Sequence, residues 1–82
     1  MKSVKEQKSY GCIKLRLREY LDERGIKRGT LASHADTRYD VINKWYDSNL
    51  ERMDLDVLAR ICYALDCDIS DLLVYHADDT NE

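Results

Sequence analysis

The sequence has no apolar run that approaches the roughly 18 residues of a membrane-spanning helix. Its start, MKSVKEQKS, also lacks the apolar stretch of a secretory signal peptide. The three cysteines, Cys12, Cys62 and Cys67, form an odd set without a CxxC pair, which suits free thiols in a reducing compartment better than a disulfide framework. We therefore expect a cytoplasmic protein that does not associate with membranes.

Residue patterns of catalytic and metal sites are also missing. Neither His34 nor His76 has an evident Asp, Ser or Cys partner, so we interpret both as surface imidazoles rather than catalytic bases. Cys62 and Cys67 occur at positions that favour small buried side chains over metal ligands. We expect no enzymatic activity, no metal and no cofactor.

The length of 82 residues allows one domain with a small core and leaves no room for a second. Hydrophobic residues make up 44% and charged residues 35%, which is typical of a folded soluble protein. We expect a flexible basic arm over residues 1–12, a folded domain over residues 13–75 and an acidic tail over residues 76–82.

The net charge of -3 argues against indiscriminate binding to nucleic acid, but the charge is unevenly distributed. Residues 1–30 carry nine Lys or Arg and four Asp or Glu, whereas residues 31–82 carry four and twelve. Such asymmetry can orient a domain on a phosphate backbone, and a solvated charged surface gives the same tally. Charge alone therefore does not identify the partner.

The spacing of apolar residues predicts a short extended segment followed by five short helices. Apolar and basic side chains alternate over residues 13–18, which is the period of a strand. We expect the first helix from about Leu17 to Gly25, where a left-handed glycine would allow Ile26 to fold back onto Leu21. The inner face of this helix carries Leu17, Tyr20 and Leu21.

A second helix is expected over residues 28–35 and a third from Arg38. Thr37 is predicted to be the N-cap of the third helix, with the Asp40 carboxylate reaching back to the Thr37 amide. The inner residues of the second helix are Leu31, Ala32 and Ala35, and those of the third are Val41, Ile42 and Trp45. Trp45 is thus interpreted as a core residue rather than a base-stacking one.

A fourth and a fifth helix follow a polar loop over residues 47–52. Asp54 is predicted to cap the fourth helix, with Met53 placed to pack on Leu58, and Asp68 and Asp71 are predicted to cap the fifth. The expected inner residues are Leu55, Leu58, Cys62 and Leu65 in the fourth helix, and Ile69, Leu72 and Leu73 in the fifth.

The second and third helices have the form of a unit that presents its second helix to the DNA major groove. One helix is about 10 to 12 Å across and fits that groove, where donors and acceptors near its N-terminus meet base edges. For Tyr39, a groove contact and packing on the protein surface both remain open.

From about residue 17 to residue 75, the chain resembles the Cro/C1 family of helix-turn-helix regulators of bacteria and phages, also called the Xre family. The resemblance is carried by ERGI, TLA, V-I-x-x-W and LDVLARICYALDCDISDLL. It implies an all-α, five-helix, lambda-repressor-like domain with the second and third helices as its helix-turn-helix. The segment ICYALDCDISDLLVY resembles the small subgroup that ends soon after the fifth helix, so we expect no effector domain and no small-molecule ligand.

The resemblance also implies two sets of DNA-binding residues. The base-reading set at the start of the third helix is Arg38, Tyr39, Asp40, Asn43 and Lys44. The phosphate-binding set, at the start of the second helix and near both ends of the third, is Lys27, Arg28, Thr30, Thr37, Ser48, Asn49 and Arg52.

The sequence departs from the family pattern at several of these positions. Asp36 replaces the usual turn glycine, although Asp tolerates a left-handed backbone better than most residues, and Arg28 replaces a common Gln. The carboxylates of Asp40, Asp47 and Glu51 would repel phosphate unless they are paired or turned away.

These patterns predict a sequence-specific transcriptional regulator, a repressor. The resemblance implies that it binds a pseudo-palindromic DNA operator as a homodimer. Two dimer surfaces remain open: the fifth helix with Leu73, Val74 and Tyr75, or residues 13–18 as an added strand. The alternative is a protein-interaction module, such as an antitoxin or anti-repressor, whose acidic second half binds a protein partner.

Overall fold

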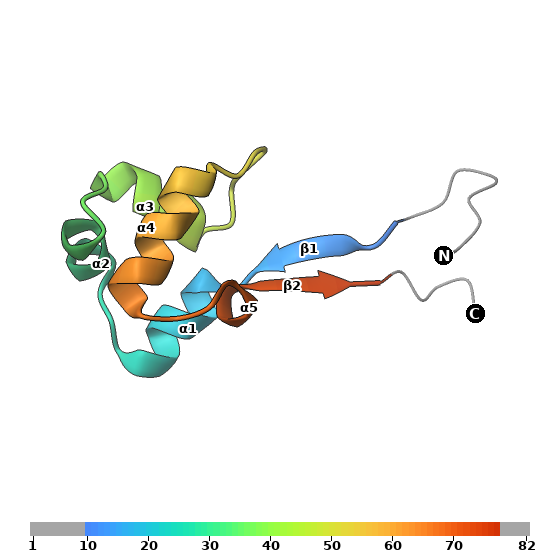
Figure 1. Cartoon of the computed structure of the whole chain (residues 1–82), viewed down its shortest axis with the longest axis horizontal. Coiled ribbons are helices and arrows are strands. Elements are labelled where there is room, and N and C mark those ends of the chain that lie inside the picture. The colour runs from blue at the N-terminus through green and yellow to red at the C-terminus, as the bar shows by residue number, and fades with distance from the viewer. Residues whose placement is uncertain (1–9, 78–82) are drawn as a thin grey trace.

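The computed structural model describes residues 10–77, so most of the predicted arm and tail lies outside the described residues. Five helices form a body from which a two-stranded hairpin projects (Figure 1). The elements are β1 (Cys12–Leu15), α1 (Leu17–Arg24), α2 (Arg28–His34), α3 (Tyr39–Tyr46), α4 (Leu55–Leu65), α5 (Ile69–Leu72) and β2 (Leu73–His76). The predicted five helices and the extended segment before them are confirmed.

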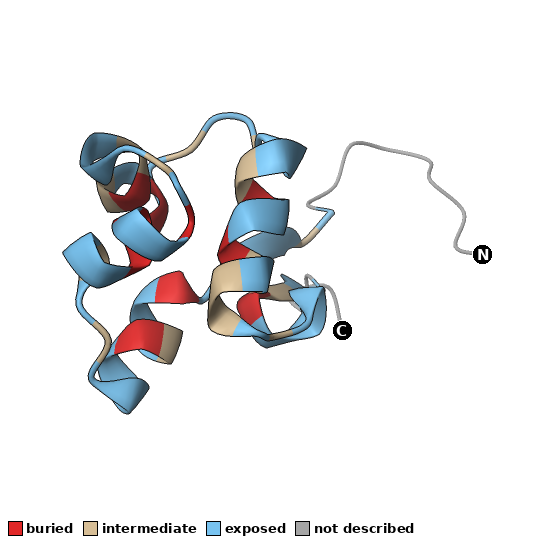
Figure 2. Ribbon diagram, turned by 60° about the vertical axis from the view of Figure 1, so that its left-hand side comes forward, coloured by how far each residue is buried: buried red, intermediate tan, exposed pale blue. Residues whose placement is uncertain are grey.

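The core lies where the five helices meet, and each helix contributes to it (Figure 2). Its buried residues are Leu17, Leu21, Leu31, Ala32, Ala35, Ile42, Trp45, Leu58, Ile61 and Leu72. The inner faces predicted for α1, α2 and α3 are confirmed, with Tyr20 and Val41 at the partly buried edge. Within residues 10–77, no helix is long and apolar enough to cross a membrane.

Two helices turn different residues inward from those expected. Leu55 was predicted to be inner but is 73% exposed, and Ile61 is fully buried in its place. Leu55 is the first residue of α4 and lies beyond the edge of the core, so the helix packs through Leu58 and Ile61 instead. Ile69, the first residue of α5, is likewise 56% exposed, which contradicts the prediction.

The ends of α1 to α4 share one backbone pattern. A left-handed residue follows each helix, and the next amide donates back to a carbonyl in the last turn. After α1, Gly25 has φ 65° and the Ile26 amide donates to the Leu21 carbonyl at 2.9 Å, as predicted. Asp36, Ser48 and Asp66 occupy the equivalent positions after α2, α3 and α4.

The helix starts differ in how they are capped. The Asp54 carboxylate accepts hydrogen bonds from the Asp56 and Val57 amides at 2.8 and 3.3 Å, which confirms the predicted cap of α4. Asp68 and Asp71 form the predicted capping box of α5, with the Asp68 amide 2.9 Å from the Asp71 carboxylate.

The hairpin joins two segments that are far apart in the sequence. β1 and β2 are antiparallel, with Cys12 opposite His76 and Leu15 opposite Leu73. Leu73 was predicted to extend the fifth helix, but α5 ends at Leu72 and Leu73 begins β2 because the backbone there is extended, with φ -119° and ψ 133°. A Cβ atom at Gly11 would collide with the His76 carbonyl, so a glycine is needed where the hairpin closes.

Candidate nucleic-acid interface

The turn between α2 and α3 is held by backbone geometry and by α4. Asp36 adopts φ 52°, the left-handed conformation that the sequence led us to expect, and the Thr37 amide donates to the Ala32 carbonyl at 2.9 Å. From α4, Arg60 donates to the Asp36 carbonyl oxygen at 2.6 Å and to the Asp56 carboxylate at 2.9 Å. Arg60 was not among the predicted site residues, although its spacing four residues after Asp56 marks it as a helix ion pair.

Thr37 is not the N-cap of α3, contrary to the sequence prediction. Arg38 occupies the cap position without a side-chain cap bond, and α3 begins at Tyr39. The Thr37 hydroxyl instead donates to the Ala35 carbonyl at 2.9 Å. The Asp40 carboxylate, expected to reach the Thr37 amide, accepts two hydrogen bonds from Arg38. A strong charged donor next to Asp40 thus replaces the weaker amide contact.

The outer face of α3 is polar, and the inner face of the same helix is buried against the core. Ile42 and Trp45 are 0% and 2% exposed, which holds the helix against the core from below. The predicted base-reading residues on the opposite side are exposed except for Asn43, which is partly buried: Arg38, Tyr39, Asp40, Asn43 and Lys44. Tyr39 keeps half of its surface exposed, so both interpretations of this side chain remain open.

Two carboxylates near this face are paired. Arg38 forms a two-pronged contact with Asp40, with nitrogen-to-oxygen distances of 3.2 and 2.9 Å. Asp47, just after α3, accepts from Arg18 of α1 at 3.1 Å. Both pairs are exposed, so each contributes at most about 1 kcal/mol to stability, but the pairing reduces the negative charge that a phosphate backbone would meet.

An aromatic cluster joins α1, α2 and α3 beside this face. The hydroxyl of Tyr46 donates to the Asp22 carboxylate at 2.8 Å, and the guanidinium groups of Arg18 and Arg28 each lie 4.5 Å from the Tyr46 ring centre. The hydrogen bond to Asp22 raises the pKa of Tyr46, because the neutral hydroxyl is the donor. Arg28 also donates to the Asn43 side-chain oxygen at 3.0 Å.

Sequence reasoning missed Arg18, Asp22 and Tyr46. Their contacts join residues 18 to 29 positions apart in the chain, and helical periodicity reports only neighbours three or four residues apart. The sequence offered one signal for this cluster: Tyr46 follows the inner residue Trp45 at the end of an amphipathic helix.

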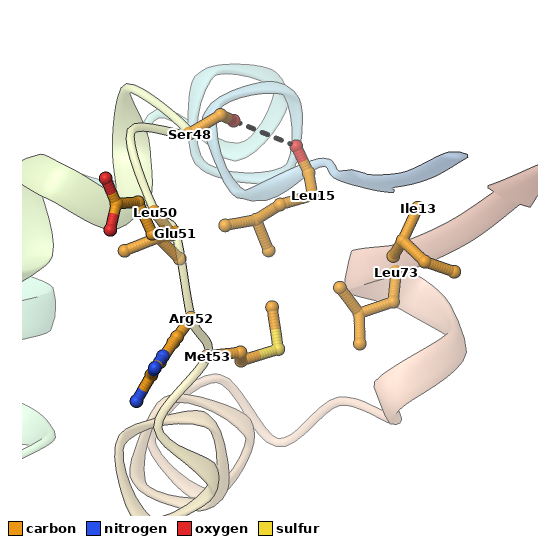
Figure 3. Close-up of a pocket in the computed structure, with 8 residues that line it drawn as sticks. All are labelled: Ile13, Leu15, Ser48, Leu50, Glu51, Arg52, Met53 and Leu73. Atoms are coloured by element: carbon orange, nitrogen blue, oxygen red, sulfur yellow. Dashed lines mark hydrogen bonds between the residues drawn. The ribbon is translucent and has the colours of Figure 1, made fainter. Parts of the chain in front are cut away.

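The structure places the predicted phosphate-binding residues in two regions. Lys27, Arg28 and Thr30 lie around one surface hollow at the start of α2, and Tyr39 and Tyr46 from α3 line the same hollow. Ser48 and Arg52 line a different pocket, between the α3–α4 loop and the hairpin (Figure 3). Asn49 is exposed in that loop.

The second pocket has a mostly apolar floor. Leu15, Met53 and Leu73 face its interior, and the Ser48 hydroxyl donates to the Leu15 carbonyl at 3.4 Å (Figure 3). Arg52 extends away from these apolar side chains (Figure 3). Ser48 thus connects the loop to the hairpin, and Arg52 is available on the outer surface.

The cysteines form no metal site in the described part of the chain. Residues 10–77 contain no group of three or more His, Cys, Asp or Glu side chains that could hold a metal ion. Cys62 and Cys67 are partly buried against the core as free thiols, and burial raises the pKa of Cys67 to about 11. This thiol is therefore a packing residue with little thiolate at neutral pH.

Comparisons with known proteins agree with this geometry. The profile of the Cro/C1-type HTH DNA-binding domain matches residues 16–78. Among solved structures, the chain is similar to "Crystal structure of transcriptional regulator VanUg, Form II", with a TM-score of 0.63 and 23% identity, covering 93% of this chain and 100% of that chain. No curated protein matches the sequence. The structural similarity shows the shared fold, and the profile match over most of the chain shows that it belongs to the family of Cro/C1-type helix-turn-helix DNA-binding domains.

Proposed function

We propose that the protein is a sequence-specific transcriptional repressor that inserts α3 into the major groove of an operator. The observation that carries this proposal is the outer face of α3, which is polar and exposed while Ile42 and Trp45 hold the helix from below. Among residues 10–77, no other segment buries Arg38, Tyr39, Asp40 or Lys44. A helix presented in this way can bring its N-terminal side chains to base edges.

The base-reading residues in this proposal are Arg38, Tyr39, Asp40, Asn43 and Lys44. Lys27, Arg28 and Thr30 lie around one hollow with Tyr39, so a backbone phosphate beside the groove would meet them together. Asn49 and Arg52 would contact phosphate from the α3–α4 loop. The hydroxyls of Thr37 and Ser48, at the two ends of α3, would donate to phosphate by turning away from the Ala35 and Leu15 carbonyls. The pairing of Asp40 and Asp47 with arginines supports the approach of an anion.

A selection from random duplex DNA tests this function. We expect the full chain to enrich a motif, with an affinity that falls about 100-fold or more between about 50 and 200 mM salt if four or more cations contact phosphate. A double Arg38→Ala, Lys44→Ala variant should lose the motif and remain folded, since both side chains are exposed.

The matched control is Lys14→Ala with Arg24→Ala, which removes the same charge from β1 and α1. This control should keep the preference for the motif. Equal loss in both double variants would assign the effect to net charge and would contradict the role of α3.

A protein-interaction module is the second candidate, because the net charge is -3 and the pocket beside the hairpin has an apolar floor. In that case the chain would retain no DNA even at low salt. Specific retention at low salt would exclude the module as the main function.

We also propose that the protein binds its operator as a homodimer. The two dimer surfaces that the sequence left open meet in part: residues 73–75 of one pair with residues 13–15 of the other in the hairpin, whereas α5 and residues 16–18 lie outside it. An antiparallel strand can pair with its own copy across a two-fold axis, which matches the symmetry of a palindromic operator.

A further inference from the structure

The two most exposed large apolar side chains of residues 10–77 both belong to α4. Leu55 is 73% exposed and Tyr63 is 86% exposed. They are eight residues apart, and the exposed Ala59 lies midway between them. All three therefore project from one side of the helix, over a length of about 12 Å. We call these three residues the α4 stripe.

Neither the fold nor helix propensity explains the stripe. The side of α4 that faces the core packs through Leu58 and Ile61. Leucine and alanine are strong helix formers, but tyrosine is a weaker one, so propensity does not account for Tyr63. Within residues 10–77, no hydrogen bond or ring contact involves the Tyr63 side chain. Single exposed apolar residues are ordinary, whereas a row of them is typical of a surface that binds a partner.

A pocket beside the stripe gives a partner a place to insert a side chain. Ala59 and Tyr63 line this pocket from α4, and His34 and Ala35 line it from the end of α2. The two alanines are small, so they allow another helix to approach closely. A helix laid along α4 would cover the stripe and reach the pocket at the same time.

The charges around the stripe are mainly negative. Asp56 follows Leu55 on α4, Asp36 lines the pocket, and Asp66 donates its amide to the Tyr63 carbonyl at 3.2 Å. The one Lys or Arg of α4 and the pocket is Arg60, which lies 2.9 Å from the Asp56 carboxylate and 3.8 Å from that of Asp36. The excess of carboxylates repels DNA phosphate and repels the same surface on a second copy, whereas it attracts a basic partner.

We propose that the α4 stripe is a docking surface for a protein partner that presents a basic amphipathic helix. The aliphatic side chains of that helix, three or four residues apart, would cover Leu55 and Tyr63 and enter the pocket beside Ala35. Its lysine or arginine residues would pair with the carboxylates at the border. The stripe and its border share no residue with the proposed DNA interface, so this inference does not depend on DNA binding.

Selection from random peptides of about 16 residues, roughly four helical turns, with the full chain as the target tests this inference. The enriched peptides should be basic, with apolar residues at the spacing i, i+3 or i+4 and i+7. Their affinity should fall as salt is raised. It should also fall about tenfold or more in a Leu55→Ser, Tyr63→Ser variant, because two large side chains at the centre of the contact are lost.

The matched control is Tyr10→Ser with Ile69→Ser, which also removes a tyrosine and a branched aliphatic residue from exposed positions. This control should bind the selected peptides as the wild type does. In proton–nitrogen correlation spectra of the full chain, the strongest peptide should shift amides of α4 and of the end of α2. Thermal unfolding of both double variants confirms that each is folded when its affinity is measured.

The outcomes separate this inference from the proposed function, because the selection contains no DNA. Enrichment of acidic peptides, or of no peptide, would overturn the inference and leave the proposed function untouched. Equal binding to the two double variants, or spectral shifts centred on α3 or the hairpin, would also overturn it. Loss of self-association in the Leu55→Ser, Tyr63→Ser variant, measured by sedimentation, would assign the stripe to a contact between copies instead.

Discussion

Trp45 is the residue whose burial does most to hold α3 against the core with its polar face toward solvent. It is the only tryptophan in the sequence, and 2% of its surface is exposed. Its neighbour Tyr46 has a different role, because it packs only at the partly buried edge of the core, its hydroxyl donates to Asp22 and its ring lies against Arg18 and Arg28. Of these two adjacent aromatic residues, Trp45 packs in the core, whereas Tyr46 joins α3 to α1 and α2.

Trp45→Ala should destabilise the fold by about 3 to 5 kcal/mol, because it removes a buried indole and leaves a cavity. A small domain has a total stability of about 5 to 15 kcal/mol, so most of the margin would be lost. Urea denaturation followed by far-UV circular dichroism measures the change. Tyr63→Ala, at a side chain that is 86% exposed, is the control and should unfold at nearly the wild-type midpoint. Equal midpoints for the two variants would contradict the core role of Trp45.

Among the elements, the helices differ in what fixes their ends. α4 begins at a carboxylate that accepts two backbone amides, whereas Arg38 provides no side-chain cap for α3. Three helices end at a left-handed Asp or Ser where glycine would be easier. α3 therefore depends more on its packing and on the Arg60 contact to the turn than on local capping.

Asp54→Ala should lower the free energy of unfolding by about 1 kcal/mol, since two amides at the start of α4 lose their acceptor. Asp54→Asn should have little effect, because asparagine caps as well as aspartate does. Chemical denaturation of the three proteins under one set of conditions checks this. If Asp54→Ala unfolded at the wild-type midpoint, or if Asp54→Asn lost as much stability as Asp54→Ala, the side chain of Asp54 would not stabilise the protein by capping α4.

The whole molecule combines a helical body with a hairpin that leaves much of its surface exposed. Ile13 and Tyr75 are directly opposite each other and are 62% and 60% exposed. An isolated two-stranded hairpin is marginally stable, and this one is held to the body by the Arg16 amide, 2.7 Å from the Leu72 carbonyl. Exposed apolar side chains on a short sheet favour association with another chain.

Replacing Ile13 and Tyr75 with threonine should shift the protein from dimer to monomer while keeping the strands, because threonine retains the preference for strand structure. Sedimentation equilibrium measures the mass. The control, Tyr63→Ser with Ile69→Thr, changes two exposed apolar residues on the helices and should remain dimeric. A dimeric hairpin variant, or a monomeric wild type, would contradict dimerisation through the hairpin.

Features that depend on neighbours along the chain follow from the sequence alone. Apolar spacing predicted the five helices and the inner faces of α1 to α3, and local side-chain chemistry predicted the caps at Asp54 and Asp68 and the left-handed turn at Asp36. The extended segment at β1 also followed from alternation. These features are local because a helix or strand repeats over a few residues.

Contacts between distant residues emerge only when the helices and strands pack together. The folded chain shows which side of α4 packs inward, that Leu73 begins a strand paired with β1, and that Asp40 and Asp47 are matched by arginines. It also places Arg28 against Asn43, which no spacing in the sequence indicates. The physical reason is that the energies of such contacts depend on which elements lie side by side, and periodicity within one element carries no information on its neighbours in space.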